Sequence, residues 1–529
     1  MKWLTAEINT LKLDLLYFKH SHFLQQALST RDDNSASQKE HIELLEALIV
    51  NALCVYKLSR AHTATIHEKA MHPGDQACLV VVDALLMLGK LNAKVSAAIL
   101  QALCLLEFVL ADNKHNFLAR TQLAGLSQTF GLYNLASQAY QALDVKEVLH
   151  ETMCPLLFLR IGSTHAPTLK GFNSYDAMTK ALDFYSKSLD KIPDYQSLAL
   201  EHANYTQVIH MHQFREQLYL SPTRLMLVFE RKRLARLLHD QVPGASGKID
   251  QPELADELRN AYSGTAEVPK RAQPDRHPGP PLTKQYNEWL MIVDLAFELA
   301  RSKQLEKASV EASLQTFMHL LKLFDGRGTE KVLTDAEMNI LKASETVFSV
   351  LLYLVGIAIP ADVLDASVAL KTLEATMATS LEKYSDHTQD QFDILPNWTA
   401  YHEAYLTLEL CQVLDALTEK VQKTKPNSAT SGVDHKAVQE SAKRLKTQAK
   451  ELFELVQKQF STYKKDVAGY DNAQLLQLVM GGDEAETEMV VARMVYEVMG
   501  VQNVKRFLQN YVNSARISID AVLSIKLRK

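Results

Sequence analysis

The chain has 529 residues, of which 47% are apolar and 22% charged, and its net charge is −5 from 57 basic and 62 acidic side chains. This composition is ordinary for a folded globular protein, and the length predicts about two to four folding units or an extended repeat array rather than one compact core. The near balance of charge excludes a general attraction to nucleic acid or to an anionic membrane, although a local basic patch is compatible with it.

The sequence opens inside an amphipathic helix, whose apolar residues recur at helical spacing: Leu4, Ile8, Leu11, Leu15 and Phe18. Charged residues interrupt this run, which excludes a signal peptide and a membrane span, and the cytoplasm is the expected compartment. A helix that starts without a cap is expected if earlier repeats are missing from this chain. The five cysteines form no CxxC pair and are odd in number, which favours small buried side chains over a disulfide or zinc site.

Helical periodicity continues along the whole chain and predicts two blocks of helices. The first block comprises 39–70, 75–90, 93–112, 115–130, 132–143, 145–161, 174–190, 195–219 and 222–240. The second comprises 283–325, 334–357, 361–386, 394–421, 434–465 and 471–527. The β-like runs are limited to 79–83 and 516–520, and the latter also fits a helix. The fold is therefore predicted to be all-α.

A change in composition separates the two blocks. Seven of the fifteen prolines fall within 241–282, where their density blocks helix continuation and favours an extended connection. The predicted organisation is a helical-repeat region at 1–240, a flexible Pro/Gly-rich linker at 241–282 and a C-terminal helical region at 283–529. A lesser loop at 423–434 divides the last region.

The stretch from Leu123 to Met153 predicts an αα-hairpin, because Gly131 separates two apolar stripes that each follow helical spacing. It is similar to a tetratricopeptide repeat in both helices and in the turn. Leu123 and Ala124 form the large–small pair of the first helix, Gly131 is the turn glycine, and Tyr133 is the aromatic residue after it. Ala136, Tyr140 and Leu143 occupy the small, aromatic and closing positions of the second helix. Part of the pattern recurs at Ala181, Tyr185 and Leu189. A single hairpin cannot bury its stripes alone, so the repeats are expected to stack into an α-α solenoid, a superhelix. The alternative is an irregular helical domain with one such hairpin.

No constellation typical of catalysis is found in the sequence. The run Gly244–Lys248 is too short for a phosphate loop, and His210 and His212 would point in different directions on a helix. A basic run on one predicted helix could contact phosphate, including ribosomal RNA, through Arg231, Lys232, Arg233 and Arg236. The alternative interpretation of this run is a solvated helix face.

The segment YQALDVKEVLHETM at 140–153 resembles the non-catalytic subunit of the NatB N-terminal acetyltransferase complex, the Mdm20-like family. The resemblance rests on a Leu-Asp-x-Lys stretch after the hairpin and an acidic–Thr pair on the next helix, here Leu143, Asp144, Lys146, Glu151 and Thr152. The segment at 72–88 is similar to the family's lead-in to this region. Together the matching part covers about 70–190, and family members are usually longer.

The resemblance implies a non-catalytic helical-repeat scaffold that binds a catalytic partner of the GNAT fold and helps it meet nascent chains at the ribosome. It implies acetylation of proteins that begin Met-Asp, Met-Glu or Met-Asn, with acetyl-CoA on the partner and no cofactor on this chain. The nearest approach to the acetyl-CoA motif is 128–133, where Tyr133 fills a position that requires glycine or alanine.

Partner contacts are predicted at the polar residues around the motif: Asp144, Lys146, Glu147 and Glu151. For Asp144 and Lys146, a packing role as a helix cap and an apolar stem is an equally good interpretation. Two other functions stay open at this point. One is a different helical scaffold, such as a subunit of a proteasome-lid or trafficking complex, and the other is an enzyme whose site no motif reveals.

Overall fold

The structure is a computed structural model, and it describes residues 2–20, 36–62, 72–92, 94–164, 168–169, 172–238, 278–325, 332–357, 364–385, 395–424, 435–470, 476–477, 479 and 486–527. The all-α prediction is confirmed over these ranges, and 79–83 and 516–520 are both helical. The described residues also form one short strand pair that no pattern predicted, β1 (Thr168–Leu169) antiparallel to β2 (Phe172–Asn173). Most of the predicted linker at 241–282, and nearly all of the predicted loop at 423–434, lies outside the described residues.

The chain folds into two compact units. Unit 1 comprises Met1–Asp144, Phe392–Pro396 and Lys465–Ile517, and unit 2 comprises Val145–Gln391, Asn397–Lys464 and Ser518–Lys529. Unit 2 therefore contains residues from both sides of the predicted linker, and a domain boundary at 241–282 stays a prediction.

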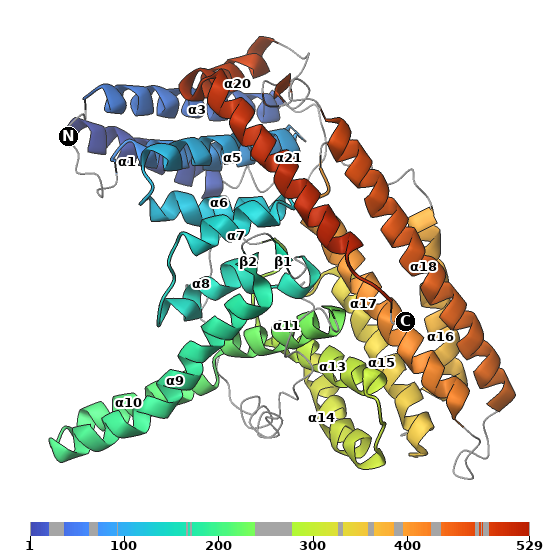
Figure 1. Cartoon of the computed structure of the whole chain (residues 1–529). Coiled ribbons are helices and arrows are strands. Elements are labelled where there is room, and N and C mark those ends of the chain that lie inside the picture. Colours follow the sequence, from blue (N-terminus) through green and yellow to red (C-terminus); the bar gives the residue numbers. More distant parts are fainter. Residues whose placement is uncertain are drawn as a thin grey trace. The chain divides into compact units, whose positions relative to one another are not determined.

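Unit 1 is built of successive helices that pack each on the next, as in a helical-repeat array (Figure 1). Their bounds are α1 (Lys2–His20), α3 (Ala36–His62), α4 (Asp75–Leu91), α5 (Val95–Asp112), α6 (Phe117–Thr129), α7 (Tyr133–Gln141), α20 (Glu486–Met499) and, up to Ile517, α21 (Val501–Leu523). The late helix α20 packs against α3 and α5. The five predicted apolar residues of α1 are all buried.

The predicted hairpin is the pair α6 and α7, and its turn has the expected conformation. Gly131 has φ 72°, a value that favours glycine. Its N–H donates to the Gln128 carbonyl at 2.9 Å, and the Leu132 N–H donates to the Ser127 carbonyl at 2.8 Å, which closes the end of α6 as a Schellman motif. The small residues of the repeat pattern are completely buried, which lets the two helices approach closely.

Unit 2 contains α8 (Leu149–Phe158), η1 (Ile161–Ser163), the strand pair, α9 (Ser174–Glu201), α10 (Tyr205–Tyr219), α11 (Pro222–Leu238), α13 (Lys284–Arg301), α14 (Lys307–Asp325), α15 (Asp335–Val355), α16 (Ala366–Ser385), α17 (Trp398–Lys423) and most of α18 (His435–Gly469). Its centre is formed by α11, α13, α15 and α17, which pack on one another. The helices α5 and α15 are long and apolar enough to cross a membrane, but most of each is buried in its own unit, as in a soluble core.

The helices α9 and α10 form an antiparallel hairpin that extends away from the other helices of unit 2 (Figure 1, green). The predicted break at 191–194 is wrong, because α9 continues through Pro193 to Glu201. A proline removes only one helical N–H donor, and packing along the rest of α9 compensates for that loss. The chain turns instead at Ala203, whose φ is 52°, and Asn204 caps α10 by accepting from the Gln207 N–H at 3.3 Å.

Candidate functional site

The segment that follows the repeat hairpin is an exposed corner with unusual backbone geometry. Asp144 and Glu147 have φ values of 50° and 49°, in a region that residues with a side chain rarely adopt. These values explain why the helix predicted from 145 begins only at Leu149. The N-cap of α8 is Val148, so Asp144 does not cap this helix.

Of the predicted partner-contact residues in this corner, Asp144, Lys146 and Glu147 are exposed. Sequence analysis missed the two apolar residues beside them, since Val148 and Leu149 are 58% and 51% exposed. Two adjacent exposed apolar side chains make this corner a candidate for a protein–protein contact. We refer to residues 146–149, all of which belong to unit 2, as the α8 corner.

The fourth predicted contact residue, Glu151, has an internal role. Its carboxylate accepts a hydrogen bond from the Tyr185 hydroxyl at 2.7 Å and another from the Ser221 hydroxyl at 2.6 Å. Its carbonyl accepts from the Thr223 hydroxyl at 2.9 Å. Glu151 therefore joins α8 to α9 and to the start of α11, and its contact with a partner stays a prediction.

The basic run at 231–236 lies on α11 and is largely turned inward. Arg233 is 1% exposed, and its Nε lies 2.6 Å from Glu409 Oε2 on α17. Arg236 is also buried, with its Nε 3.3 Å from Glu409 Oε1 and its Nη1 bonded to Asp294 on α13. The charges of these two arginines are already neutralised inside unit 2, which does not favour the predicted contact with RNA, and that contact stays a prediction.

The other two cations of the run are half-buried and also engaged by neighbours. The Nζ of Lys232 lies 3.0 Å from Asp294 Oδ2, and Arg231 Nη1 donates to the Thr179 hydroxyl at 3.4 Å. Burial alone would raise the pKa of Asp294, but the charges of Lys232 and Arg236 outweigh it and hold the pKa below its ordinary value. A phosphate contact through Arg231 and Lys232 stays a prediction.

A second buried ion pair fixes the loop between α8 and η1. Arg160 is fully buried, and its Nε lies 2.8 Å from Glu337 Oε1 at the start of α15. Its Nη1 donates to the Pro280 carbonyl at 2.6 Å. Glu337 also accepts from the backbone N–H of Thr334 at 2.7 Å, as part of a capping box. One carboxylate thus caps α15 and neutralises Arg160.

The carboxylate of Glu230 on α11 completes the network. It accepts from the Gly162 N–H at 2.8 Å and from the Tyr286 hydroxyl at 2.6 Å. A β-carbon at Gly162 would lie 2.7 Å from Glu230 Oε2, so this close approach requires glycine. Burial raises the pKa of Glu230. These buried ion pairs and hydrogen bonds together connect η1, α11, α13, α15 and α17. They form one polar network within the core of unit 2.

A serine, a histidine and a glutamate meet in this core, and their geometry bears on the hypothesis of an unrecognised enzyme. Ser163 Oγ lies 2.6 Å from His402 Nδ1, and His402 Nε2 lies 3.1 Å from Thr334 Oγ1 and 3.5 Å from Glu337 Oε1. Burial lowers the pKa of His402 to about 3, so the ring is neutral. A nucleophilic serine has to reach a substrate, whereas this one is completely buried. We therefore assign Ser163, His402 and Glu337 a structural role in the core of unit 2.

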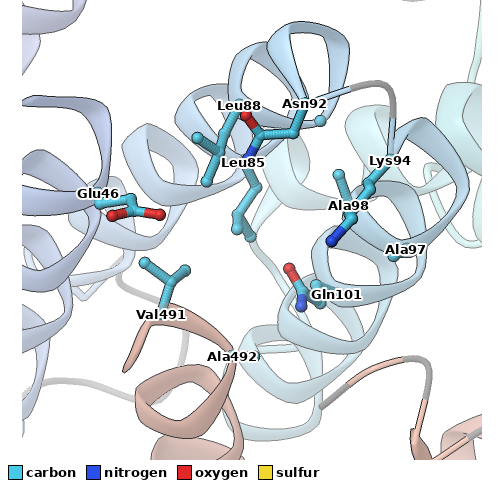
Figure 2. A pocket seen from close by; sticks show the side chains of 11 residues that line it. Glu46, Leu85, Leu88, Asn92, Lys94, Ala97, Ala98, Gln101, Val491 and Ala492 are labelled. Atoms are coloured by element: carbon cyan, nitrogen blue, oxygen red, sulfur yellow. The ribbon is translucent and has the colours of Figure 1, made fainter. Parts of the chain in front are cut away.

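Unit 1 contains a shallow pocket between α3, α4, α5 and α20 (Figure 2). Its lining is mainly apolar, with Leu85 and Val491 facing the space, and Glu46 and Lys94 lie on opposite sides of it. Gln101 borders it and donates to the Val479 carbonyl at 2.8 Å. The pocket has the size and lining to accept one apolar side chain.

Comparison of the sequence with known proteins identifies a family. Residues 4–278, more than half of the chain, match the sequence profile described as "N-acetyltransferase B complex (NatB) non catalytic subunit". A curated relative, "N-terminal acetyltransferase B complex subunit arm1" of Schizosaccharomyces pombe, is 27% identical over 167 residues. That match spans 30% of this chain and only 20% of the relative.

Two solved structures align with this chain. "The NatB Acetyltransferase Complex Bound To CoA and MES" contains a chain that aligns with 96% of this one and 64% of its own length, at 13% identity and a TM-score of 0.50. "The NatB Acetyltransferase Complex Bound To bisubstrate inhibitor" aligns over 91% and 58%, at 14% identity and a TM-score of 0.47. The profile match, which includes the repeat hairpin and the α8 corner, shows that the chain belongs to the family of non-catalytic subunits of the N-acetyltransferase B complex.

Proposed function

We propose that this chain is the scaffold of a NatB-type N-terminal acetyltransferase, binding a catalytic subunit of the GNAT fold. The proposal includes acetylation of nascent chains that begin Met-Asp, Met-Glu or Met-Asn, at the ribosome and in the cytoplasm, with acetyl-CoA held by the catalytic subunit. The observation that carries it is the family match over residues 4–278.

The architecture supports a role as a scaffold that binds a separate catalytic subunit. Stacked helical pairs present a large surface made of rigid elements, which suits a protein that holds another protein. The α8 corner supplies a candidate contact, because Val148 and Leu149 are exposed beside Lys146 and Glu147 on a strained backbone. Strained backbone at an exposed position is often found at functional sites, where the surrounding structure holds it in place.

Co-expression with a NatB catalytic acetyltransferase subunit tests the proposal. The expected result is a stable complex that transfers the acetyl group to a peptide beginning Met-Asp much faster than the catalytic subunit alone, while a peptide beginning Ser-Ala is a poor substrate. This chain alone serves as the control for activity. If the two proteins do not co-purify and the rate does not change, the proposed function is wrong.

A paired replacement in the α8 corner tests the contact itself. We expect Val148→Gln with Leu149→Gln to weaken the complex, because two exposed apolar side chains lose their contact with the partner. Glu151→Gln is the comparison within the same helix: it should lower thermal stability through the Tyr185 and Ser221 bonds rather than change affinity in the folded protein. Equal affinity for the corner variant and the parent would contradict this placement.

A further inference from the structure

The end of the α9–α10 hairpin carries an unusual concentration of exposed apolar side chains. We call residues 195–214 the hairpin tip. Six large apolar residues in it are exposed: Tyr195, Leu198, Leu200, Tyr205, Ile209 and Phe214. In α10 the one buried residue is Leu218, beyond the tip. The two helices of the tip thus pack on each other and leave most of their other apolar side chains in solvent.

The exposed side chains are held in place by regular backbone. Tyr195 and Leu198 are three residues apart on α9, and Tyr205 and Ile209 are four apart on α10, so each pair lies on neighbouring turns of its helix. The turn between the helices is closed by hydrogen bonds from the Asn204 N–H to the Ala199 carbonyl at 2.8 Å and from the Ala203 N–H to the Leu200 carbonyl at 2.9 Å. Such a surface loses little conformational entropy on binding.

The charge of the tip indicates what it can bind. Between Tyr195 and Phe214 the sequence has one acidic residue, Glu201, no lysine and no arginine. RNA and anionic membranes are bound mainly through several lysine and arginine side chains, and the tip has neither residue type. Its surface instead complements an uncharged, apolar face of another folded protein, where aromatic side chains such as tyrosine are enriched among the residues that contribute most to binding.

The tip lies close enough to the α8 corner for one partner to contact both. The His150 ring of α8 packs on the Phe184 ring of α9, with 5.7 Å between their centroids. Tyr195 is further along the same helix by about 17 Å, at a rise of about 1.5 Å per residue. A small globular domain is about 30 Å across, which exceeds this separation.

We propose that the hairpin tip is a docking surface for an uncharged apolar face of the catalytic subunit. This inference rests on the proposed function and adds a second contact to the α8 corner. One partner would contact both sites, so loss of the tip contact should weaken the complex without abolishing it.

The test uses the full chain with Leu198→Gln, Tyr205→Gln and Ile209→Gln, since glutamine keeps helix propensity and removes apolar surface. A matched control, Leu364→Gln with Val368→Gln, removes exposed apolar side chains elsewhere in unit 2. Affinity for the purified catalytic subunit is measured by titration calorimetry, and the three single variants are measured as well. We expect the dissociation constant of the tip variant to rise about tenfold or more, as the loss of one hot-spot side chain does, and that of the control to stay unchanged.

The outcomes separate this inference from the proposed function. If the parent binds the catalytic subunit and the tip variant binds equally well, the tip inference is wrong and the proposed function stands. If the parent does not bind, both are wrong. If the parent chain self-associates in sedimentation experiments and the tip variant does not, with unchanged affinity for the catalytic subunit, the tip binds a second copy and the inference is overturned. If the triple variant melts at a lower temperature than the parent, the dissociation constants of the single variants test the inference instead.

Discussion

The buried carboxylate of Glu409 neutralises two arginines at once, so its replacement should be among the most damaging in unit 2. In Glu409→Gln, Arg233 and Arg236 keep their charges in the protein interior, and only Asp294 remains bonded to Arg236. Removing one partner of a buried ion pair typically costs about 3–5 kcal/mol. We expect a loss in the free energy of unfolding of about that size, because Glu409 is the one carboxylate among the described residues within ion-pair distance of the buried Arg233 guanidinium.

The assay is urea denaturation followed by fluorescence of Trp289, whose ring centroid lies 5.6 Å from the Arg233 guanidinium carbon. Phenylalanine replaces Trp3 and Trp398 in all variants so that Trp289 is the sole reporter. A double variant, Arg233→Met with Glu409→Met, removes both charges and should recover most of the lost stability, since apolar replacements of buried pairs are often neutral. If Glu409→Gln costs less than about 1 kcal/mol, or if the double variant is no more stable than the single one, the explanation is refuted.

Three further predictions concern single residues. Gly131→Val should cost roughly 1–3 kcal/mol because valine is strained at φ 72°, while Gly131→Asn, which tolerates this region, should cost less in the same thermal denaturation. Ala203→Gly should stabilise the α9–α10 turn by about 1 kcal/mol through relief of strain at φ 52°, and a lower melting temperature would contradict the turn geometry. Burial raises the pKa of Glu107 to about 7. The folded state therefore binds this proton more tightly than the unfolded state, and stability should fall as the pH rises from about 4.5 to 7; Glu107→Gln should remove that part of the pH dependence of the melting temperature.

The sequence was sufficient for features that depend on residues close together in the chain. Helical spacing predicted most of the helices, and Gly131 with its flanking stripes predicted the α6–α7 hairpin. The exposed position of Lys146 and Glu147 also followed from local polarity. These features are local because a helix or a tight turn satisfies most of its own hydrogen bonds.

Features that depend on distant partners were not predictable in this way. Nothing in the local sequence distinguishes Arg233 and Arg236 from arginines on a solvated helix face. They can be buried because Glu409, 176 and 173 residues further along the chain, pairs with both of them. Glu151 is drawn inward by hydroxyl groups on α9 and before α11. The exposed apolar tip was missed for the opposite reason: its spacing is that of a buried helix, but none of the described helices covers these side chains.

The packing of α20 against α3 and α5 has a consequence for the order in which the protein is made. Gln101 of α5 bonds to the carbonyl of Val479, so this contact can form only after a segment 378 residues further along the chain has been synthesised. Contacts between residues so far apart in sequence form slowly, because a long loop has to close first. While translation continues, the face that α20 later covers is exposed to solvent, where a chaperone that binds apolar helix faces could shield it.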